Sequence, residues 1–289
     1  MNEKLIFGHY FVAFIDLLGQ RDKLKNLDAL PSDDGGPDYD EFVQVVKDTV
    51  GAVEDLQRSA SDFFTSFISN NENSVLKEFP GYERINKTEI KFQHFSDGLV
   101  IYIPLRTDND FTPSKSIYGA LVACGGLCLL GLAKKRPIRI GISIGVAAEL
   151  RKNELYGKAV ADAYEMESLI AKYPRAVVSN DVIKYLLSYA NQTCKKDDFH
   201  CQMTKKMAQD SLEMLTNDFD GNAIVNYLGE YFQKNISAIS NTEVFELAYK
   251  FIQEELEHHQ KTKNTKLAFR YSILHGYFYE HYNQYIKSA

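Results

Sequence analysis

The alternation of apolar and polar positions begins with a buried strand. Residues 9–15 (HYFVAFI) are rich in β-branched and aromatic side chains, which predicts a strand that ends at Asp16. Turn-forming residues indicate a loop at 31–39, and apolar residues at helical spacing predict a long helix over 39–68. The predicted chain therefore opens on a strand, a first helix that begins within residues 16–19, a loop and a long second helix.

A hairpin is the clearest local signal after that helix. Two apolar runs, 89–95 and 99–105, flank Ser96-Asp97-Gly98, and an Asp-Gly pair favours the tight turns that join antiparallel strands. The elements predicted next are a helix at 114–134, a strand at 138–147, a helix at 157–172 and a strand at 175–179. Hairpin and crossover connections are both present, so we expect an α/β (α+β) sandwich with helices over a mostly antiparallel sheet.

The pattern changes beyond residue 190. Residues 191–209 are polar and rich in lysine, residues 218–222 form a turn by composition, and residues 242–287 place aromatic side chains at helical spacing. We expect one domain over 1–228 and a C-terminal helical extension over 229–289 that packs on it.

The apolar helix at 114–134 raises the question of a membrane span. Residues 117–133 carry no charge and precede a Lys-Lys-Arg run, as a span with a positive flank does. This run is shorter than the roughly 20 apolar residues that a bilayer core requires. Its glycines would allow close packing, so we favour a helix buried in an oligomer and expect no membrane partner.

Composition narrows the partners further. The 289 residues carry a net charge of -6, which leaves no basic surface to neutralise long nucleic acid. The four cysteines do not have the spacing of a disulfide framework, and Cys194, His200 and Cys201 lack the paired spacing of a zinc site. Together with the lack of a signal-peptide pattern, this predicts a cytoplasmic protein.

Asp16 and Asp97 are the candidate metal ligands. If the hairpin lies beside the first strand, the two carboxylates converge at one edge of the sheet. Such a pair suits Mg²⁺ or Mn²⁺, which take one or two carboxylates together with substrate phosphates. A structural explanation stays open for each residue, because Asp97 could serve only its turn and Asp16 could cap the helix that follows.

Four segments in this order resemble the class III nucleotidyl cyclases. They are FVAFIDLLG, FQHFSDGLVIYI, IRIGISIGVAAEL and ELYGKAVADAYEMES, within residues 8–180. The resemblance implies a ferredoxin-type sandwich with two Mn²⁺ or Mg²⁺ ions per site. Its implied metal ligands are Asp16, the carbonyl of Leu17, and Asp97, and its implied nucleotide-binding residues are Phe14, Leu18, Gly19, Gln93 and Glu154.

The opening FVAFIDLLGQRD, the FSDG hairpin and the aromatic helical tail are closer to one group. They resemble the bacterial pyrimidine cyclases of the Pycsar antiphage defence. This resemblance implies a homodimeric lyase that converts UTP or CTP to cyclic UMP or cyclic CMP. It also implies that the product activates a separate effector protein.

The base-reading positions depart from the adenylate cyclase pattern. Adenylate cyclases have a lysine four residues before the second metal aspartate and an acid just ahead of a Tyr-Gly pair. Here Gln93 and Glu154 stand at those places, so the adenine-reading pair is incomplete. A glutamine amide both donates and accepts, so it could serve a uracil or a cytosine edge equally. The Pycsar resemblance implies a pyrimidine nucleotide, with UTP slightly ahead of CTP, whereas a carboxylate at Glu154 would accept a hydrogen bond from the cytosine amino group and favour CTP.

A second departure concerns the phosphate. Ala161 and Glu165 stand where purine cyclases place a ribose-binding asparagine and an arginine for the transition state. A cation must therefore come from elsewhere, and Arg21 and Lys158 are candidates by position. Two alternatives remain: a cyclase-like module that binds a nucleotide without turnover, and a metal-dependent phosphohydrolase, for which two carboxylates are too few.

Overall fold

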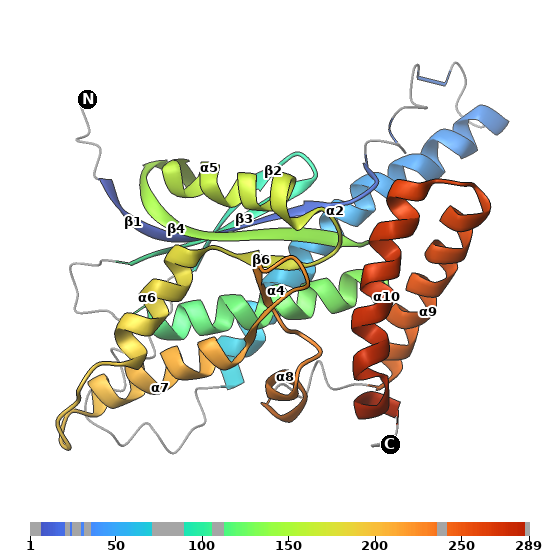
Figure 1. Cartoon of the computed structure of the whole chain (residues 1–289). Helices are drawn as coiled ribbons and strands as arrows, with labels where there is room; N and C mark the ends of the chain where they lie inside the picture. The colour runs from blue at the N-terminus through green and yellow to red at the C-terminus, as the bar shows by residue number, and fades with distance from the viewer. Residues whose placement is uncertain are drawn as a thin grey trace.

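The computed structural model describes residues 7–20, 24, 30–31, 36–70, 90–105, 113–235 and 242–286. They form a sheet with helices on both faces (Figure 1). The elements of the first half are β1 (Phe7–Leu17), α2 (Pro37–Asn70), β2 (Lys91–Phe95), β3 (Gly98–Pro104), α4 (Ser114–Ala133), β4 (Ile138–Arg151) and β5 (Glu154–Gly157). Those of the second half are α5 (Lys158–Glu165), the π-helical turn η2 (Met166–Ala171), β6 (Ala176–Val178), α6 (Asn180–Ala190), α7 (Phe199–Glu213), β7 (Leu215–Asn217), β8 (Ala223–Val225), α8 (Glu230–Asn235), α9 (Thr242–Lys261) and α10 (Thr265–Ile286).

The described strands form one sheet in the order β2-β3-β1-β4-β6-β8-β7, with β5 paired to β4. Only the pairing of β4 with β6 is parallel among these strands, and the others are antiparallel. The first four strands and the helices α2 and α4 follow the β-α-β-β-α-β order of a ferredoxin-like unit. The predicted mixed α/β sandwich with a mostly antiparallel sheet is thus confirmed.

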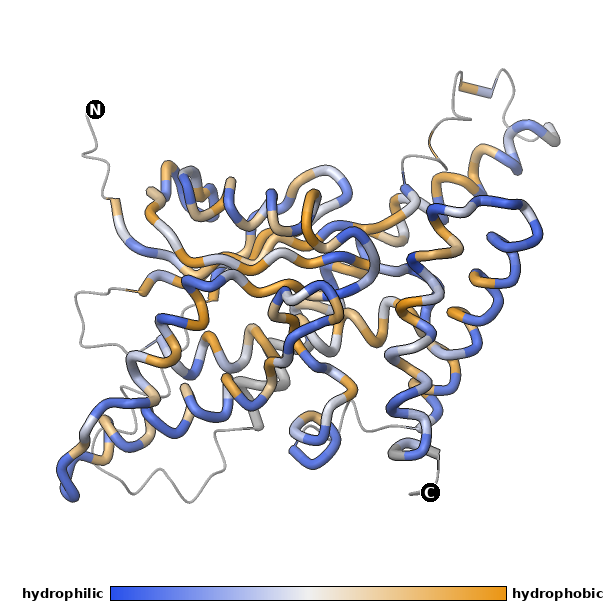
Figure 2. Tube along the Cα trace, viewed as in Figure 1, coloured by the Kyte–Doolittle hydropathy of each residue, from blue (hydrophilic) through white to orange (hydrophobic). Residues whose placement is uncertain are grey.

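Strand β1 is apolar on both faces because both faces are covered. Every second residue from Phe11 to Leu17 packs into the large core on one face of the sheet. Val12 points to the other face and belongs to a smaller core under α5. A strand with two buried faces has a nearly continuous apolar sequence, as residues 9–15 do. Figure 2 shows the hydrophobic strands at the centre and hydrophilic positions along the outer sides of α9 and α10.

Helix α4 is the core helix of the large layer. It is long and apolar enough to cross a membrane by length and composition alone, yet 78% of that stretch is buried inside the molecule. Its neighbours are the sheet and the helices α2, α7 and α9. The predicted buried helix is confirmed, but a single chain covers it. Its burial therefore does not support the expectation that an oligomer hides it.

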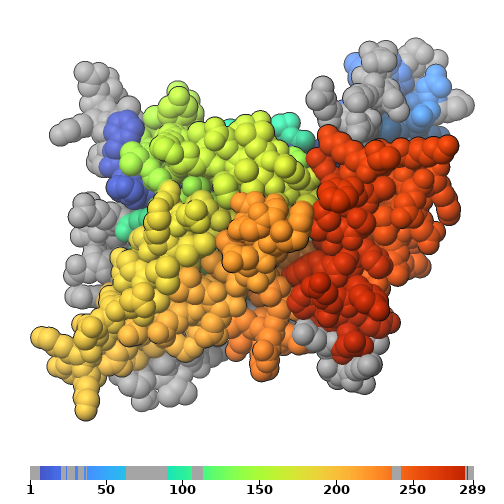
Figure 3. All heavy atoms as spheres, in the orientation of Figure 1, coloured from blue at the N-terminus to red at the C-terminus, as the bar shows by residue number. Residues whose placement is uncertain are grey.

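The C-terminal helices α9 and α10 form a hairpin against one end of the sheet (Figures 1 and 3). Helix α9 packs on α4, and Lys135 after α4 forms an ion pair with Glu254 of α9 at 2.7 Å. On α10, the Tyr277 hydroxyl donates to Oδ1 of Asn226 at 2.9 Å and accepts from the Leu228 amide at 3.0 Å. The extension is thus held by specific contacts at both of its helices.

Several elements differ from the prediction. The strand predicted at 138–147 continues to Arg151 and returns as β5, and the polar stretch 191–209 contains most of α7. Asp198 caps α7 by accepting from the Cys201 amide at 2.9 Å, which turns the chain back. Cys194 and Cys201 form a disulfide across this bend, with 5.6 Å between their Cα atoms. The cysteine spacing had indicated no such pair.

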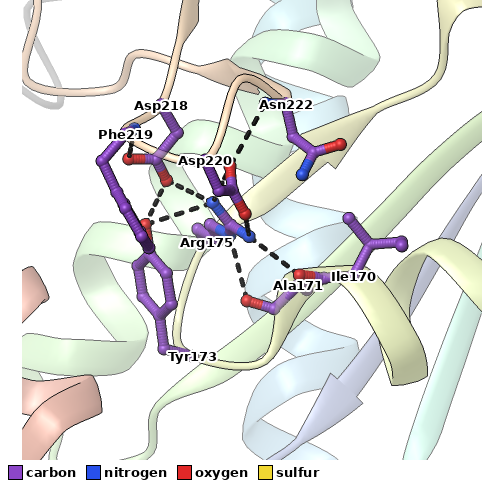
Figure 4. A network of polar contacts seen from close by, with 8 residues as sticks. All are labelled: Ile170, Ala171, Tyr173, Arg175, Asp218, Phe219, Asp220 and Asn222. Atoms are coloured by element: carbon purple, nitrogen blue, oxygen red, sulfur yellow. Dashed lines mark hydrogen bonds and ion pairs between the residues drawn. The ribbon is translucent and has the colours of Figure 1, made fainter.

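Arg175 ties the entry of β6 to the β7–β8 turn (Figure 4). Its guanidinium donates to the carbonyls of Ile170 and Ala171 at 2.8 and 3.0 Å, and it pairs with Asp220 at 2.7 Å and with Asp218. The side chain is buried, so these partners satisfy a cation that would otherwise be costly to desolvate. We assign this network to the stability of the sheet rather than to the candidate site.

Candidate active site

The structure brings Asp16 and Asp97 together. Asp16, near the end of β1, lies opposite Gly98 at the start of β3, and Asp97 is the residue before Gly98. The negative charge of Asp97 acts on Asp16 and contributes to a raised pKa there. The predicted convergence of the two carboxylates at one edge of the sheet is therefore present in the structure.

The turn alone does not explain the Asp97-Gly98 pair. The loop between β2 and β3 is Ser96-Asp97, and the positive φ falls on Ser96, at 26°, not on Asp97 or Gly98. Gly98 has another reason to be glycine, because a Cβ there would lie 3.0 Å from the carbonyl oxygen of Ile15. The small residue lets the hairpin press against the end of β1, which keeps Asp97 beside Asp16.

Asp16 does not act as a helix cap. It lies inside β1, paired with both neighbouring strands, and its Oδ2 accepts a hydrogen bond from Nη2 of Arg139 at 3.3 Å. Arg139 is its direct partner on β4. The side chain is 25% exposed, enough for a ligand to reach a carboxylate held in place by the strand.

Arg139 and Glu167 complete the cluster, and the sequence interpretation had missed both. Nη2 of Arg139 lies 2.6 Å from Oε1 of Glu167, a residue of η2 whose side chain is 3% exposed. One signal in the sequence could have indicated Arg139, because it is the lone charge within the apolar strand IRIGISIG. Glu167 gave no such signal, since its position depends on how η2 packs on the sheet.

Gly141 explains how Glu167 reaches Arg139. A Cβ at Gly141 would lie 2.1 Å from the carbonyl oxygen of Ala163 and 2.4 Å from the amide nitrogen of Glu167. Only glycine allows the backbone of α5 and η2 to approach β4 so closely. Arg139 and Gly141 are two residues apart and so face the same side of the sheet, where η2 lies.

Burial governs the electrostatics of the cluster. Burial raises the pKa of Asp16, an effect opposed by Arg139 and reinforced by Asp97. Burial also raises the pKa of Glu167 to about 7, again opposed by Arg139 and reinforced by Asp16. Three acids and one guanidinium thus share a small volume, and one further positive charge there would stabilise the ionised carboxylates.

The residues present fit a hard divalent cation. Carboxylate oxygens are the ligands that Mg²⁺ and Mn²⁺ prefer, and Mg²⁺ commonly uses one or two of them with substrate phosphates and water. The described residues contain no group of three or more His, Cys, Asp or Glu side chains arranged to hold a metal. Asp16 and Asp97 would therefore hold a metal together with phosphate, rather than enclose one alone.

The predicted metal ligand Leu17 and the predicted nucleotide-binding residues Phe14, Leu18 and Gly19 lie near Asp16 along the chain, on β1 and in the turn after it. Phe14 packs against Phe95 and Tyr164 at centroid distances of 5.9 and 5.3 Å. Leu17 is buried on the opposite face, so a role at the site falls to its carbonyl. Leu18 and Gly19 form the turn after β1, where Gly19 has a φ of 84°.

Gln93 and Glu154 are close to each other. Oε1 of Gln93 accepts a hydrogen bond from the amide of Leu155 at 2.8 Å, next to Glu154 in β5. The Glu154 carboxylate is 44% exposed and lies 3.8 Å from a guanidinium nitrogen of Arg151. The bond to Leu155 uses the acceptor of the Gln93 amide, so its NH₂ group remains to donate.

The positions that depart from the purine cyclase pattern lie on α5. Ala161 and Glu165 are exposed there, and Lys158 pairs with Asp162 on the same helix at 2.6 Å. Lys158 precedes Glu167 by nine residues, which is about 13 Å along a helix axis. Arg21 lies outside the described residues. The cation that the structure places beside Asp16 is therefore Arg139, not Lys158.

Two cavities among the described residues lie away from the carboxylates. A cleft of about 480 Å³ runs between the β7–β8 turn and α10, and a cavity of about 30 Å³ lies behind Leu17. Neither Asp16 nor Asp97 lines either space. The candidate site is thus separate from both of these spaces.

No family model matches the chain, and no curated protein is significantly similar to it. Among solved structures, the chain is similar to the catalytic core of a rhodopsin-guanylyl cyclase with converted specificity, in complex with ATPalphaS. That match has 13% identity and a TM-score of 0.37 over 64% of this chain and 85% of that one. Two structures of a bacterial light-regulated adenylyl cyclase are each 15% identical.

The first of these two has a TM-score of 0.38 over 73% of this chain and 60% of that one. The second has a TM-score of 0.37 over 71% of this chain and 99% of that one. TM-scores below 0.5 at such identities do not establish a family. Evidence for function therefore comes from the site and from the sequence motifs.

Proposed function

We propose that the chain is a nucleotidyl cyclase whose metal site is formed by Asp16, Asp97 and the Leu17 carbonyl. The observation that carries this proposal is the convergence of Asp16 and Asp97 beside Arg139 at one edge of the sheet. The four sequence segments that resemble class III cyclases provide independent support. In this proposal the 3'-hydroxyl oxygen of the ribose attacks the α-phosphorus of a nucleoside triphosphate.

Atoms balance in a single displacement. A bond forms between the 3'-oxygen and the α-phosphorus, the bond from that phosphorus to the bridging oxygen breaks, and pyrophosphate leaves with its electron pair. The hydroxyl proton passes to solvent. Two bound Mn²⁺ or Mg²⁺ ions would supply a lowered hydroxyl pKa and charge stabilisation on the phosphates.

The described residues position this reaction. Asp16 and Asp97 hold the charge that attracts the metal, and Glu167 orients Arg139 through the 2.6 Å ion pair. Arg139 has a planar guanidinium suited to phosphate oxygens, and it stands beside Asp16 where charge develops in the transition state. Arg139 thus provides the cation that Glu165 does not.

A pyrimidine substrate is the finer part of the proposal. The lysine expected of an adenylate cyclase is absent, and the NH₂ group of Gln93 would donate to a base carbonyl such as O4 of uracil. We therefore place UTP ahead of CTP. The Pycsar resemblance extends the proposal to an antiphage signal that activates a separate effector protein.

A homodimer is part of the same proposal. In the family that the motifs resemble, each site joins metal residues of one chain to base-reading residues of another. Several large apolar side chains near β5 and α5 are exposed and would suit such an interface: Val146, Leu150, Tyr156 and Leu169. Light scattering at micromolar concentration should give a dimer, and a fully active monomer would remove this part of the proposal.

The alternative is a cyclase-like module that binds a nucleotide without turnover. The exposed Ala161 and Glu165 favour it, since neither can act on ribose or phosphate as the purine cyclase residues do. Incubation of the purified chain with each of the four ribonucleoside triphosphates and Mn²⁺, with product masses measured, separates the two. A cyclic monophosphate formed only with metal supports the enzyme, whereas metal-dependent binding with unchanged triphosphate supports the module.

A further inference from the structure

Four strands bring their termini to the same end of the sheet. Leu17, at the end of β1, pairs with Ile138 at the start of β4, and the parallel strand β6 begins beside β4. Because β8 is antiparallel to β6, its last residue, Val225, lies at this end as well. This is the end at which Asp16, Asp97 and Arg139 meet.

Helix α10 lies across that end. Asn226 directly follows β8, and it accepts the hydrogen bond of the Tyr277 hydroxyl at 2.9 Å. Figure 3 shows the surface of α10 next to the surfaces of the segment after α5 and of the β7–β8 turn. Tyr271, Leu274 and Phe278 are buried, which fixes the rotation of the helix about its axis.

The position of Arg270 along α10 corresponds to the start of β4, where Arg139 lies. It precedes Tyr277 by seven residues, two helical turns, so both side chains lie on one face and are about 10 Å apart along the axis. The start of β4 is two strands away from the end of β8, which is also about 10 Å. Figure 1 shows the C-terminal end of α10 farthest from β4 and its N-terminal half beside the end of the sheet, so a helix anchored to β8 through Tyr277 carries Arg270 toward the start of β4.

Electrostatics agree with this placement. The pKa of Arg270 is lowered, first by burial and then by the positive charge of Arg139. Arg139 has carboxylate partners in Asp16 and Glu167, whereas no acid within the described stretches forms an ion pair with Arg270. Two guanidinium groups held near each other repel, and an anion between them would offset that repulsion.

We propose that Arg270, contributed by the C-terminal helical extension, is a phosphate-binding residue that holds the terminal phosphates of the triphosphate at the metal edge. This inference rests on the proposed function for the identity of the ligand. In this proposal Asp16 and Asp97 would hold the metal, and the guanidinium groups of Arg139 and Arg270 would bind the anionic tail of the triphosphate. The extension thereby becomes part of the site rather than an appendage.

The test measures, by calorimetry, the binding of inorganic tripolyphosphate to the full chain in the presence of Mn²⁺. We expect Arg270→Ala to weaken binding about tenfold or more, and Arg270→Lys to retain much of the affinity because a point charge remains. Lys266→Ala, one turn earlier on α10 and exposed, is the matched control and should bind as the parent does.

A structural role for Arg270 would predict a lower melting temperature in Arg270→Ala. Removing one of two repelling cations should instead leave the melting temperature unchanged or higher. If Arg270→Ala does not fold, Arg270→Met, which keeps the length of the apolar stem, is measured in its place. Binding within twofold of the parent in a folded variant overturns the inference.

Turnover separates this inference from the proposed function. If the parent forms cyclic nucleotide, Arg270→Ala should raise KM for the triphosphate about tenfold and change kcat less. An unchanged KM in an active enzyme contradicts the role of Arg270 alone. A parent that binds tripolyphosphate through Arg270 and yet forms no cyclic nucleotide supports the phosphate site and contradicts the proposed reaction.

Discussion

Asp16 and Arg139 face each other across the β1–β4 pair, with 3.3 Å between Oδ2 of Asp16 and Nη2 of Arg139. The same guanidinium group reaches Glu167, which is almost fully buried. Arg139 therefore balances two carboxylates: that of Asp16, which we assign to the metal, and that of Glu167, which positions Arg139. Loss of Arg139 would leave the buried Glu167 without its cation.

We predict that Arg139→Met destabilises the fold by about 3 kcal/mol, because a buried pair that loses one partner leaves an uncompensated charge. The double variant Arg139→Met/Glu167→Gln removes both charges and should recover most of that loss. Urea unfolding at pH 7.5 measures both. Equal stability of the single and double variants would contradict the pairing.

The double variant also isolates the role of Arg139 in turnover. With the fold restored, cyclic nucleotide formation should remain about 100-fold below the parent, since the cation beside the developing phosphate charge is absent. Product masses at saturating Mn²⁺ provide the rate. A double variant as active as the parent would assign Arg139 to stability only.

Gly141 should not tolerate a side chain. We predict that Gly141→Ala costs about 1–3 kcal/mol, because its Cβ would overlap the backbone of Ala163 and Glu167. Gly276→Ala in α10 is the matched control: no atom lies within 4 Å of its Cβ, and alanine favours a helix by about 0.5–1 kcal/mol. Thermal unfolding of both variants checks the difference in sign.

The Arg175 network predicts a pH dependence of stability. The hydrogen bond that Arg175 donates to the Asp220 carboxylate holds the pKa of Asp220 at about 2, below the ordinary 3.8. The folded state thus binds fewer protons than the unfolded state in this range, and the stabilisation present above pH 3.8 is lost as the pH falls toward 2.

Asp220→Asn should therefore be less stable than the parent at pH 7, by about 1 kcal/mol, with the difference shrinking below pH 4. Asp181→Asn, whose carboxylate pairs with Lys184 on the exposed side of α6, is the control and should show no such trend. Urea unfolding at several pH values tests this. A difference that is constant with pH would contradict the assigned pairing.

Local pattern was sufficient to predict the strands that carry or flank the two aspartates. Asp16 and Asp97 could be predicted because each ends or joins a strand with a strong apolar sequence, and a β-α-β-β-α-β order places those strands side by side. The role of Gly98 was only partly predicted. Its close approach to Ile15 arises from packing between strands, not from turn preference.

Arg139 and Glu167 could not be predicted in the same way. Their contact depends on the register of β4 against β1 and on the glycine that lets η2 approach the sheet. Helix α7 was missed because its sequence is polar and its apolar face is narrow, and β5 because it is short. Each of these depends on contacts between distant segments.

The base preference gives a prediction of its own. With equimolar UTP, CTP, ATP and GTP, we expect mainly cyclic UMP, because the Gln93 NH₂ group matches the acceptor O4 of uracil. Gln93→Glu keeps an acceptor for the Leu155 amide but replaces the donor, and should move the product ratio toward cyclic CMP. A purine product from the parent would contradict the pyrimidine assignment.

The metal site is the central claim, and cyclic nucleotide formation by Asp16→Ala and Asp97→Ala tests it most directly. Asp181→Ala on α6 is the control, and circular dichroism confirms folding of each variant. With Mn²⁺ and the preferred triphosphate, both site variants should lose at least about 100-fold in product formed per unit time, because each lacks a metal ligand. Product formation within about tenfold of the parent in both folded variants would contradict the two-carboxylate site.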